Sequence, residues 1–205
     1  MVIWLIGLSG SGKSTIGKIV YKKLKKKNKN TVWLDGDMVR KIYNDNLGFT
    51  NKDRETNAKR LSNLSKFLSD QKINVVGSVL SNFPKWQKWN KKNIKDYNQV
   101  YIKVSLKNLL LRDKKDLYKK ALKKMKKNVV GVDIKFHEPN NSDLIIDNNI
   151  KTKNFNKISN KLIEFIKKKI NQFTNDNYYS LYPYYIRDNS INFFYKSSKK
   201  VSVDN

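Results

Sequence analysis

Short apolar runs alternate along this chain with longer amphipathic stretches, and the alternation predicts an α/β fold. The predicted strands are the apolar runs at residues 2–6, 31–34, 73–80, 99–104 and 143–146. A continuously apolar run such as 73–80 is typical of a strand that is buried on both faces. The order of the elements therefore indicates a parallel β-sheet flanked by helices.

Helical spacing is found between these strands. We expect helices from near Lys13 to about Lys27 and over residues 51–70, 85–97 and 155–173. Over 51–70 the apolar positions recur on one helical face, at Ala58, Leu61, Leu64, Phe67 and Leu68. In the helix over 85–97, Trp86 and Trp89 are expected to be packing anchors.

Two segments lie outside this alternation. Residues 113–138 are dense in Lys and poor in apolar periodicity, and a connection of this length is more often a lid than a disordered link. Residues 174–205 hold six of the eleven tyrosines, a composition too aromatic for ordinary disorder. We predict one domain over 1–173 with a lid at about 113–138, followed by a tail that packs on the domain or on a partner subunit. A homodimer is left open.

The formal net charge of +27 should attract polyanions. However, 39 of the 44 basic residues are Lys and Asn is abundant at 27, so a compositional bias over exposed faces explains the charge better than a nucleic-acid site does. The chain has no cysteine, which excludes disulfides and thiolate metal sites, and no apolar run approaches membrane-spanning length. We expect a cytoplasmic protein that binds small-molecule nucleotides, with no membrane contact and with nucleic acid disfavoured.

A glycine-rich turn directly follows the first predicted strand and fits G-x-x-x-x-G-K-[ST], the phosphate-binding P-loop. Its residues are Gly7, Leu8, Ser9, Gly10, Ser11, Gly12, Lys13, Ser14 and Thr15. Backbone N–H groups of such a turn converge on phosphates, and the following helix adds the positive end of its dipole. Lys13 would reach the β- and γ-phosphates, and Ser14 would bind Mg²⁺. The motif predicts binding of a nucleoside triphosphate, against the alternative of an ordinary glycine-rich turn.

Polar side chains follow the next two predicted strands. Asp35 and Asp37 follow the second strand, and Ser81 follows the third. Ligands of open α/β sheets bind at the carboxyl ends of the strands, so these side chains should lie beside the P-loop. The structural alternative is that they cap the helices that come next.

A series of motifs makes a family resemblance specific. Gly7–Thr15, Leu34-Asp35-Gly36-Asp37 with Arg40, Leu47-Gly48-Phe49, Asp53-Arg54 with Asn57, Ser81 and Leu117-Tyr118-Lys119-Lys120-Ala121 occur in the order and near-spacing of adenylylsulfate (APS) kinases. Together they cover about residues 2–150. The resemblance implies a P-loop NTPase-type fold and an enzyme of sulfate assimilation. Such an enzyme transfers the γ-phosphate of ATP, with Mg²⁺, to the 3′-hydroxyl of adenylyl sulfate, making 3′-phosphoadenylyl sulfate.

The resemblance also implies roles for single residues. Lys13, Asp37 and Ser81 are the candidate catalytic residues, with Asp37 orienting or deprotonating the acceptor hydroxyl. Asp35 and Ser14 are candidates for Mg²⁺, which keeps several waters in such sites. Ser81 matches a serine that is phosphorylated in some members, although direct in-line transfer needs no phosphoenzyme. The ATP side is assigned Gly7, Ser9, Gly10, Ser11, Gly12, Lys13, Ser14, Thr15 and Arg112, and the lid Lys115, Lys119 and Lys120.

The acceptor side is assigned Asp35, Arg40, Phe49, Arg54, Asn57 and Lys119. Three of the five arginines lie between residues 40 and 60, and bidentate anion binding explains that bunching better than a bias that otherwise selects Lys. Phe49 would stack on the acceptor's adenine, with core packing as its alternative. A solvent-facing position is the alternative for Asn57, and a solvated lysine run is the alternative for Lys119.

The chain departs from the family in its base-recognition half. Leu80-Ser81-Asn82-Phe83-Pro84 replaces Ile-Ser-Pro-Tyr-Arg, and Val129-Val130-Gly131 replaces Phe-Thr-Gly, which removes the second aromatic expected against the adenine. The acceptor is therefore APS or another nucleotide anhydride, such as the cytidine diphosphoramidate of surface-polysaccharide pathways. A noncatalytic nucleotide switch and a basic nucleic-acid-binding P-loop protein are the more remote alternatives.

Overall fold

A computed structural model of the chain describes residues 1–113, 116–149 and 155–175, with side chains as far as Lys169. One parallel sheet of five strands has the order β2-β3-β1-β4-β5. The strands are β1 (Val2–Ile6), β2 (Thr31–Asp35), β3 (Asn74–Val79), β4 (Tyr97–Lys103) and β5 (Leu144–Asp147). β1, which leads into the P-loop, therefore lies at the centre of the sheet, and the predicted α/β fold class is confirmed.

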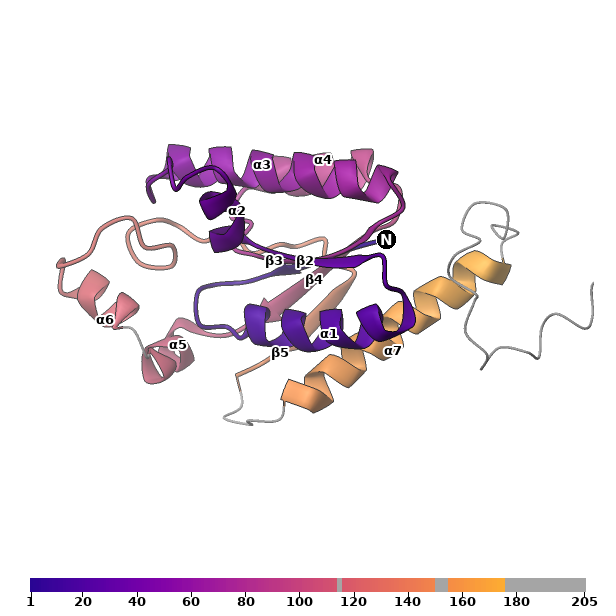
Figure 1. Ribbon diagram of the computed structural model, residues 1–205. Helices are drawn as coiled ribbons and strands as arrows, with labels where there is room; N and C mark the ends of the chain where they lie inside the picture. The colour runs from indigo at the N-terminus through magenta and orange to yellow at the C-terminus, as the bar shows by residue number, and fades with distance from the viewer. Residues whose placement is uncertain (114–115, 150–154, 176–205) are drawn as a thin grey trace, which may run out of the picture.

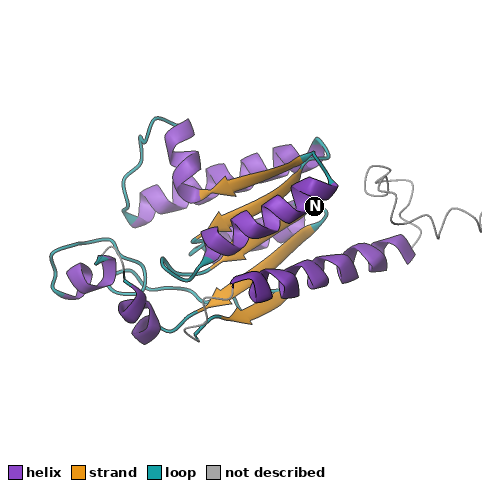
Figure 2. Ribbon diagram, turned by 60° about the horizontal axis from the view of Figure 1, so that its bottom comes forward, coloured by secondary structure: helices purple, strands orange, loops and turns teal. Residues whose placement is uncertain are grey.

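Helices cover both faces of the sheet (Figure 1). They are α1 (Lys13–Lys27), α2 (Gly36–Ile42), α3 (Asn51–Asp70), α4 (Pro84–Asn93), α5 (Leu106–Arg112), α6 (Leu117–Leu122) and α7 (Phe155–Asn175). The helices α1 and α7 lie on one face and α2, α3 and α4 on the other, while α5 and α6 lie beyond the strands' carboxyl ends (Figures 1 and 2). A site at this end of the sheet is thus bordered by both helical layers and by α5 and α6.

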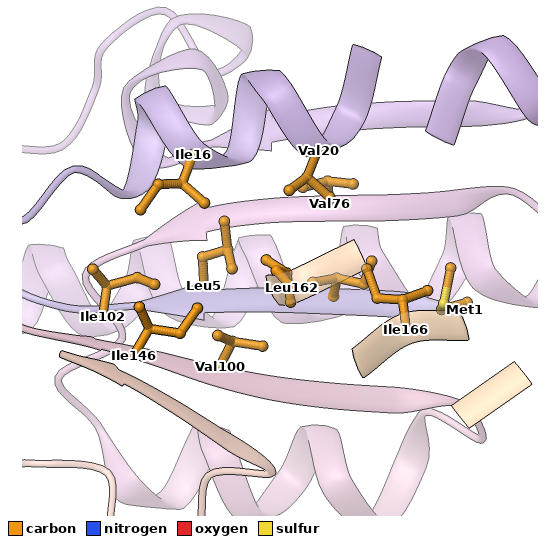
Figure 3. Close-up of a cluster of buried hydrophobic side chains, with 11 residues drawn as sticks. Met1, Leu5, Ile16, Val20, Val76, Val100, Ile102, Ile146, Leu162 and Ile166 are labelled. Atoms are coloured by element: carbon orange, nitrogen blue, oxygen red, sulfur yellow. The ribbon is translucent and has the colours of Figure 1, made fainter. Parts of the chain in front are cut away.

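The core under α1 and α7 fixes the P-loop helix to the sheet (Figure 3). Ile16 and Val20 of α1 and Leu162 and Ile166 of α7 contact side chains of β1, β3, β4 and β5. The four-residue spacing within each helix places both side chains on one face. Full burial of each aliphatic side chain stabilises the fold by roughly 1.5–3 kcal/mol. The start of α1 at Lys13 is therefore held firmly beneath the P-loop.

The opposite face of the sheet packs around Trp4 of β1. Trp4 is 2% exposed and shares its cluster with Val39 of α2 and Leu61 of α3. Its ring lies over Gly77 of the neighbouring strand β3, where a β-carbon would come within 2.8 Å of the indole. Glycine at this position therefore makes room for the indole beside the end of β1.

The start of α3 is set by a capping box. The Thr50 hydroxyl accepts the N–H of Asp53, and the Asp53 carboxylate accepts the N–H of Thr50. Arg54, the next residue, is thereby held in the first turns of the helix. The local sequence thus positions one of the predicted anion-binding residues.

Some predicted boundaries were wrong, and three short helices were not predicted. The helix expected over 85–97 ends at Asn93, because the chain enters β4 at Tyr97. The helices α2, α5 and α6 have seven, seven and six residues, too few to show a helical period. Lys115 and the tail from residue 176 lie outside the described residues. Across the described ranges, none of the helices combines the length and apolar character needed to span a bilayer.

The described part of the lid, residues 116–138, packs on the P-loop through an apolar cluster of its own. The cluster joins Leu8 of the P-loop to Leu109 of α5, Tyr118 of α6 and Val129 beyond α6. Both Tyr118 and Val129 are almost fully buried, at 2% and 3% exposed. This segment therefore makes apolar contacts although its sequence shows no apolar periodicity. Its buried residues lie on a six-residue helix and a turn, and neither is long enough to show a helical period.

Candidate functional site

A cleft of about 910 Å³ opens at the carboxyl ends of the strands. The predicted residues on its wall are Ser9, Gly10, Gly12, Lys13, Ser14, Thr15, Asp35, Asp37, Arg40, Phe49, Arg54, Asn57, Ser81 and Arg112. Gly7 and Ser11 are buried behind that wall. Lys119 lies away from the wall with an exposed side chain, and its ammonium is 3.6 Å from the Asp116 carboxylate. Most of the predicted site residues, far apart in the sequence, thus lie on the wall of one cleft; Gly7, Ser11 and Lys119 do not.

Lys13 is held under the P-loop by a backbone carbonyl. Its Nζ donates to the carbonyl of Leu8 at 2.7 Å. Desolvation lowers the pKa of Lys13 to about 8, and the carboxylates of Asp35 and Asp37 partly oppose that shift. An anion beside Lys13 would favour its charged form, so phosphate binding and protonation of Lys13 should support each other.

Ser14 of the P-loop and Asp35 at the end of β2 form a pair of potential oxygen ligands for a metal ion. The Ser14 hydroxyl donates to Oδ2 of Asp35 at 2.8 Å, while Oδ1 of Asp35 accepts the N–H of Asp37 at 3.0 Å and caps α2. Asp35 therefore does cap a helix, with its second oxygen facing Ser14. The pair fits Mg²⁺, which takes hard oxygen ligands and keeps much of its water shell. In the described ranges, no group of three or more His, Cys, Asp or Glu residues forms a cage for a metal.

Asp37 lies in the first turn of α2 with its side chain exposed on the cleft wall. The positive end of the helix dipole stabilises a carboxylate at this position. Its charge acts on Lys13 of the P-loop and on Arg40, one turn further along α2. An exposed carboxylate between two cations can accept a hydrogen bond or a proton from a hydroxyl group in the cleft.

The Phe49 ring contacts two guanidinium groups. Its ring centroid is 4.7 Å from Cζ of Arg40 and 5.3 Å from Cζ of Arg54, and the side chain is 54% exposed. The core-packing alternative for Phe49 is therefore wrong. Burial lowers the pKa of both guanidinium groups, and each lies near the Asp37 carboxylate, which opposes the shift.

The same two arginines hold the loop that carries Phe49. Nη1 of Arg40 donates to the carbonyls of Leu47 and Gly48 at 3.0 and 2.7 Å, and Nε of Arg54 donates to the carbonyl of Phe49 at 2.9 Å. Nη2 of Arg54 donates to the carbonyl of Asn128, beyond α6, at 2.7 Å. A guanidinium has five N–H donors, so these bonds leave donors for an anion in the cleft.

Asn57 and Ser81 lie on the deeper wall of the cleft. Asn57 is 6% exposed and donates from Nδ2 to the carbonyl of Gly36 at 3.3 Å, so the solvent-facing alternative is wrong. Ser81 has φ of +49°, which is uncommon for a residue with a β-carbon, and its hydroxyl accepts from the Trp4 indole at 3.3 Å. The residue that caps α4 is Phe83, so Ser81 does not have the helix-capping role.

Arg112 joins α5 to the end of β5 on another wall of the cleft. Its Nη2 donates to the carbonyls of Asn148 and Asn149, at 2.7 and 3.2 Å. Asn148 in turn donates from Nδ2 to the carbonyl of Ser11 in the P-loop at 2.8 Å. Arg112 therefore positions the segment that supports the P-loop from the β5 side.

Two residues that contact the P-loop were missed by sequence reasoning. Asn148 and Tyr118 bond the carbonyls of Ser11 and Ser9, at sequence separations of 137 and 109 residues. A side chain that bonds a distant backbone carbonyl leaves no local pattern. The available signals were the position of Asn148 just after the last strand, where site residues are expected, and the position of Tyr118 within the quoted motif of residues 117–121.

Comparison with known proteins gives one consistent result. A family model described as adenylylsulphate kinase matches residues 1–147. The cytidine diphosphoramidate kinase of Campylobacter jejuni is 41% identical over 82% of this chain and 95% of its own. The adenylyl-sulfate kinase of Clostridium kluyveri is 35% identical over 84% of this chain and 86% of its own. The structure of the Mycobacterium tuberculosis APS kinase in complex with AMPPNP and APS has a TM-score of 0.73 at 29% identity, covering 81% of this chain and 96% of that one.

Proposed function

Because this chain belongs to the adenylylsulphate kinase family, we propose that it phosphorylates the ribose 3′-hydroxyl of adenylyl sulfate, or of a closely similar nucleotide anhydride, with ATP. As a member of the family it is a kinase, a phosphotransferase with an alcohol acceptor. The observation that carries the proposal is that one cleft holds the P-loop, the exposed Asp37 and Phe49 with the two arginines that contact its ring, Arg40 and Arg54. The cleft thereby combines a site for the donor's phosphates, a base for the acceptor's hydroxyl and a site for the acceptor's anionic group.

The donor half is supported by the P-loop geometry. Its backbone N–H groups and Lys13 provide positive charge for the β- and γ-phosphates. Ser14 and Asp35 are the residues that would hold Mg²⁺, which when bound neutralises charge that develops on the phosphates during transfer. Positioning and electrostatic stabilisation dominate phosphoryl transfer, so this half needs no covalent contribution from the protein.

In the acceptor half of the site, each group on the cleft wall is given one role. Asp37 accepts the hydrogen bond of the attacking hydroxyl and takes its proton as the bond from the hydroxyl oxygen to the γ-phosphorus forms; the bond from that phosphorus to the β,γ-bridging oxygen breaks, and ADP leaves. Arg40 and Arg54 bind the charged anhydride through their remaining N–H donors. Phe49 offers its exposed ring to the acceptor base.

The base wall favours a second candidate acceptor, cytidine diphosphoramidate. Val129 lines the cleft and is 3% exposed, and as an aliphatic residue it offers no aromatic face to a base. A pyrimidine depends on a smaller stacking surface than a purine does. The Campylobacter jejuni relative that is 41% identical carries this activity in its name.

The function is tested by supplying each acceptor in turn. Purified protein with ATP and Mg²⁺ is given adenylyl sulfate or cytidine diphosphoramidate, and ADP release and the phosphorylated nucleotide are measured. We expect a kcat/KM at least about tenfold higher for one of them, which identifies the acceptor. Phosphorylation of neither, by protein that binds AMPPNP normally, would contradict the proposal.

Affinity for AMPPNP is expected to fall about tenfold between pH 7 and pH 9 because of Lys13. The pKa of Lys13 is lowered to about 8 in the free protein, and a bound phosphate raises it. Below pH 8 the amine is already protonated, whereas above it binding must include uptake of a proton. Calorimetric titration at a series of pH values measures the effect. The variant Lys13→Arg stays charged and should lose the dependence; a flat profile for the natural protein would refute this explanation.

A further inference from the structure

In the part of the P-loop that precedes α1, residues 7–12, three backbone carbonyls accept hydrogen bonds from side chains. The carbonyl of Leu8 accepts from Lys13 at 2.7 Å, and the carbonyl of Ser11 accepts from Asn148 at 2.8 Å. The carbonyl of Ser9 accepts from the hydroxyl of Tyr118, also at 2.8 Å. Lys13 begins α1 and Asn148 follows β5, so two of the three donors belong to the sheet and its core helix. Tyr118 alone among them belongs to the lid.

The bond from Tyr118 fixes the orientation of one P-loop peptide. A trans peptide is planar, and its C=O and N–H point in opposite directions. Holding the Ser9 carbonyl toward Tyr118 therefore turns the N–H of Gly10 away from Tyr118. Gly10 lies on the cleft wall with φ of +76°, a left-handed conformation that glycine adopts easily. Without the bond, the Ser9 carbonyl would lose the side chain that holds it in this direction.

Tyr118 is rigidly placed for this task. It is 2% exposed, and it packs in the cluster that also contains Leu8 and Val129. The α6 helix that carries it is held by Asp113, whose carboxylate accepts the N–H groups of Leu117 and Tyr118 at 2.8 and 2.7 Å. Burial and the Asp113 charge raise the pKa of Tyr118, so its hydroxyl remains a proton donor at neutral pH.

The lid is also bonded to the acceptor wall. Nη2 of Arg54 donates to the carbonyl of Asn128 at 2.7 Å, in the segment that precedes Val129. Val129 and Tyr118 pack in the same cluster. A continuous path of contacts therefore runs from the acceptor side of the cleft through the lid to the Ser9–Gly10 peptide.

We propose that Tyr118 is a positioning residue that holds the Ser9–Gly10 peptide in the orientation needed for phosphate binding, and so makes the grip of the P-loop on ATP depend on the lid. Tyr118 also lines the cleft, but the role proposed for it runs through its bond to the Ser9 carbonyl and so through the Gly10 N–H. The part of the proposal that concerns nucleotide affinity does not depend on which acceptor is used. Its kinetic consequence, a lower kcat/KM for ATP, rests on the proposed kinase function.

The test compares Tyr118→Phe with Tyr97→Phe. Tyr97 is also buried, at 8% exposed, and its hydroxyl bonds the Gln99 side chain at 3.0 Å, away from the cleft. Both variants keep the ring and lose only the hydroxyl group, so both should fold, as circular dichroism and thermal melting will verify. We expect the Kd for AMPPNP with Mg²⁺ to rise about five- to tenfold in Tyr118→Phe, the effect of losing about 1 kcal/mol, and to change less than about twofold in Tyr97→Phe.

An NMR measurement separates positioning from a general loss of stability. Labelling serine carbonyls with ¹³C and glycine amides with ¹⁵N selects Ser-Gly pairs, which in this sequence are Ser9-Gly10 and Ser11-Gly12. In Tyr118→Phe the Ser9 and Gly10 signals should shift while the Ser11 and Gly12 signals stay, because Asn148 still holds the Ser11 carbonyl. Unchanged Ser9 and Gly10 signals with unchanged AMPPNP affinity would overturn the proposal. Failure of the natural protein to bind AMPPNP would instead overturn the kinase function.

Discussion

Replacing Asp37 with Asn is expected to lower kcat by about 10²- to 10⁴-fold, the usual contribution of a general base. The side chain is exposed in the first turn of α2, so the exchange of one oxygen for an amide should leave the fold intact. An amide can neither take the hydroxyl proton nor carry the negative charge that faces Lys13 and Arg40. Affinity for AMPPNP should change less than about threefold, because Asp37 acts on the acceptor hydroxyl.

The matched control for this prediction is Asp45→Asn. Asp45 is an exposed acidic residue near Arg40, whose pKa it raises, but it is not on the cleft wall. Its φ of +50° is one that Asn tolerates well. Rapid-quench measurement of the first turnover with both nucleotides bound reports the chemical step directly. If Asp37→Asn and Asp45→Asn gave equal turnover, Asp37 would not be the base.

The sheet was predictable because its strands are short apolar runs that need no partner to be recognised. Val2–Ile6 and Asn74–Val79 are buried along their whole length; the first is apolar at every position, and the second has three valines beside Asn74, Gly77 and Ser78. The register between neighbouring strands could not be predicted. It depends on pairs such as Trp4 and Gly77, which only the fold brings together. The short helices were not predicted for a different reason. Seven residues, as in α2, do not complete two turns.

The phosphate side of the site was predictable because the P-loop is a local motif whose function is carried by the backbone. The side chains that hold this backbone, Tyr118 and Asn148 among them, were not predictable in the same way. Nothing next to Tyr118 in the sequence marks it as the partner of the Ser9 carbonyl, because the contact arises from the packing of α6 on Leu8. Lys119, its neighbour, was assigned to the acceptor side from the family resemblance, and in the structure its ammonium lies 3.6 Å from the Asp116 carboxylate, off the cleft wall.

The bunched arginines are a case in which the prediction was incomplete. Their concentration between residues 40 and 60 indicated an anion site, and Arg40 and Arg54 do meet on one wall. The structure adds that both guanidinium groups organise the loop carrying Phe49. Arg60 has another partner, since its Cζ lies 4.1 Å from the ring of Tyr43 and its Nη1 donates to Asn46. The clustering of arginines in the sequence could not distinguish the two that line the cleft from Arg60, which contacts other residues.

Arg54→Ala is expected to lower kcat/KM for the acceptor by about 10²- to 10³-fold, mainly through a higher KM. The change removes a charged donor to the anhydride, where such a bond contributes roughly 1.5–3 kcal/mol. It also removes the bonds that hold the Phe49 and Asn128 carbonyls, so the stacking ring loses its support. Steady-state kinetics with saturating ATP and varied acceptor measure the effect.

The variants Arg54→Lys and Arg60→Ala separate charge, geometry and general helix effects. Lysine keeps the charge but lacks the planar fork that bonds two carbonyls and an anion together, so Arg54→Lys should recover less than about a tenth of the lost kcat/KM. Arg60→Ala changes the same helix outside the cleft wall and should stay within about threefold of the natural protein. An unchanged acceptor KM in Arg54→Ala would remove this residue from the acceptor site. Full activity in Arg54→Lys would reduce its role to charge alone, because the lysine cannot hold both the Phe49 carbonyl and the lid.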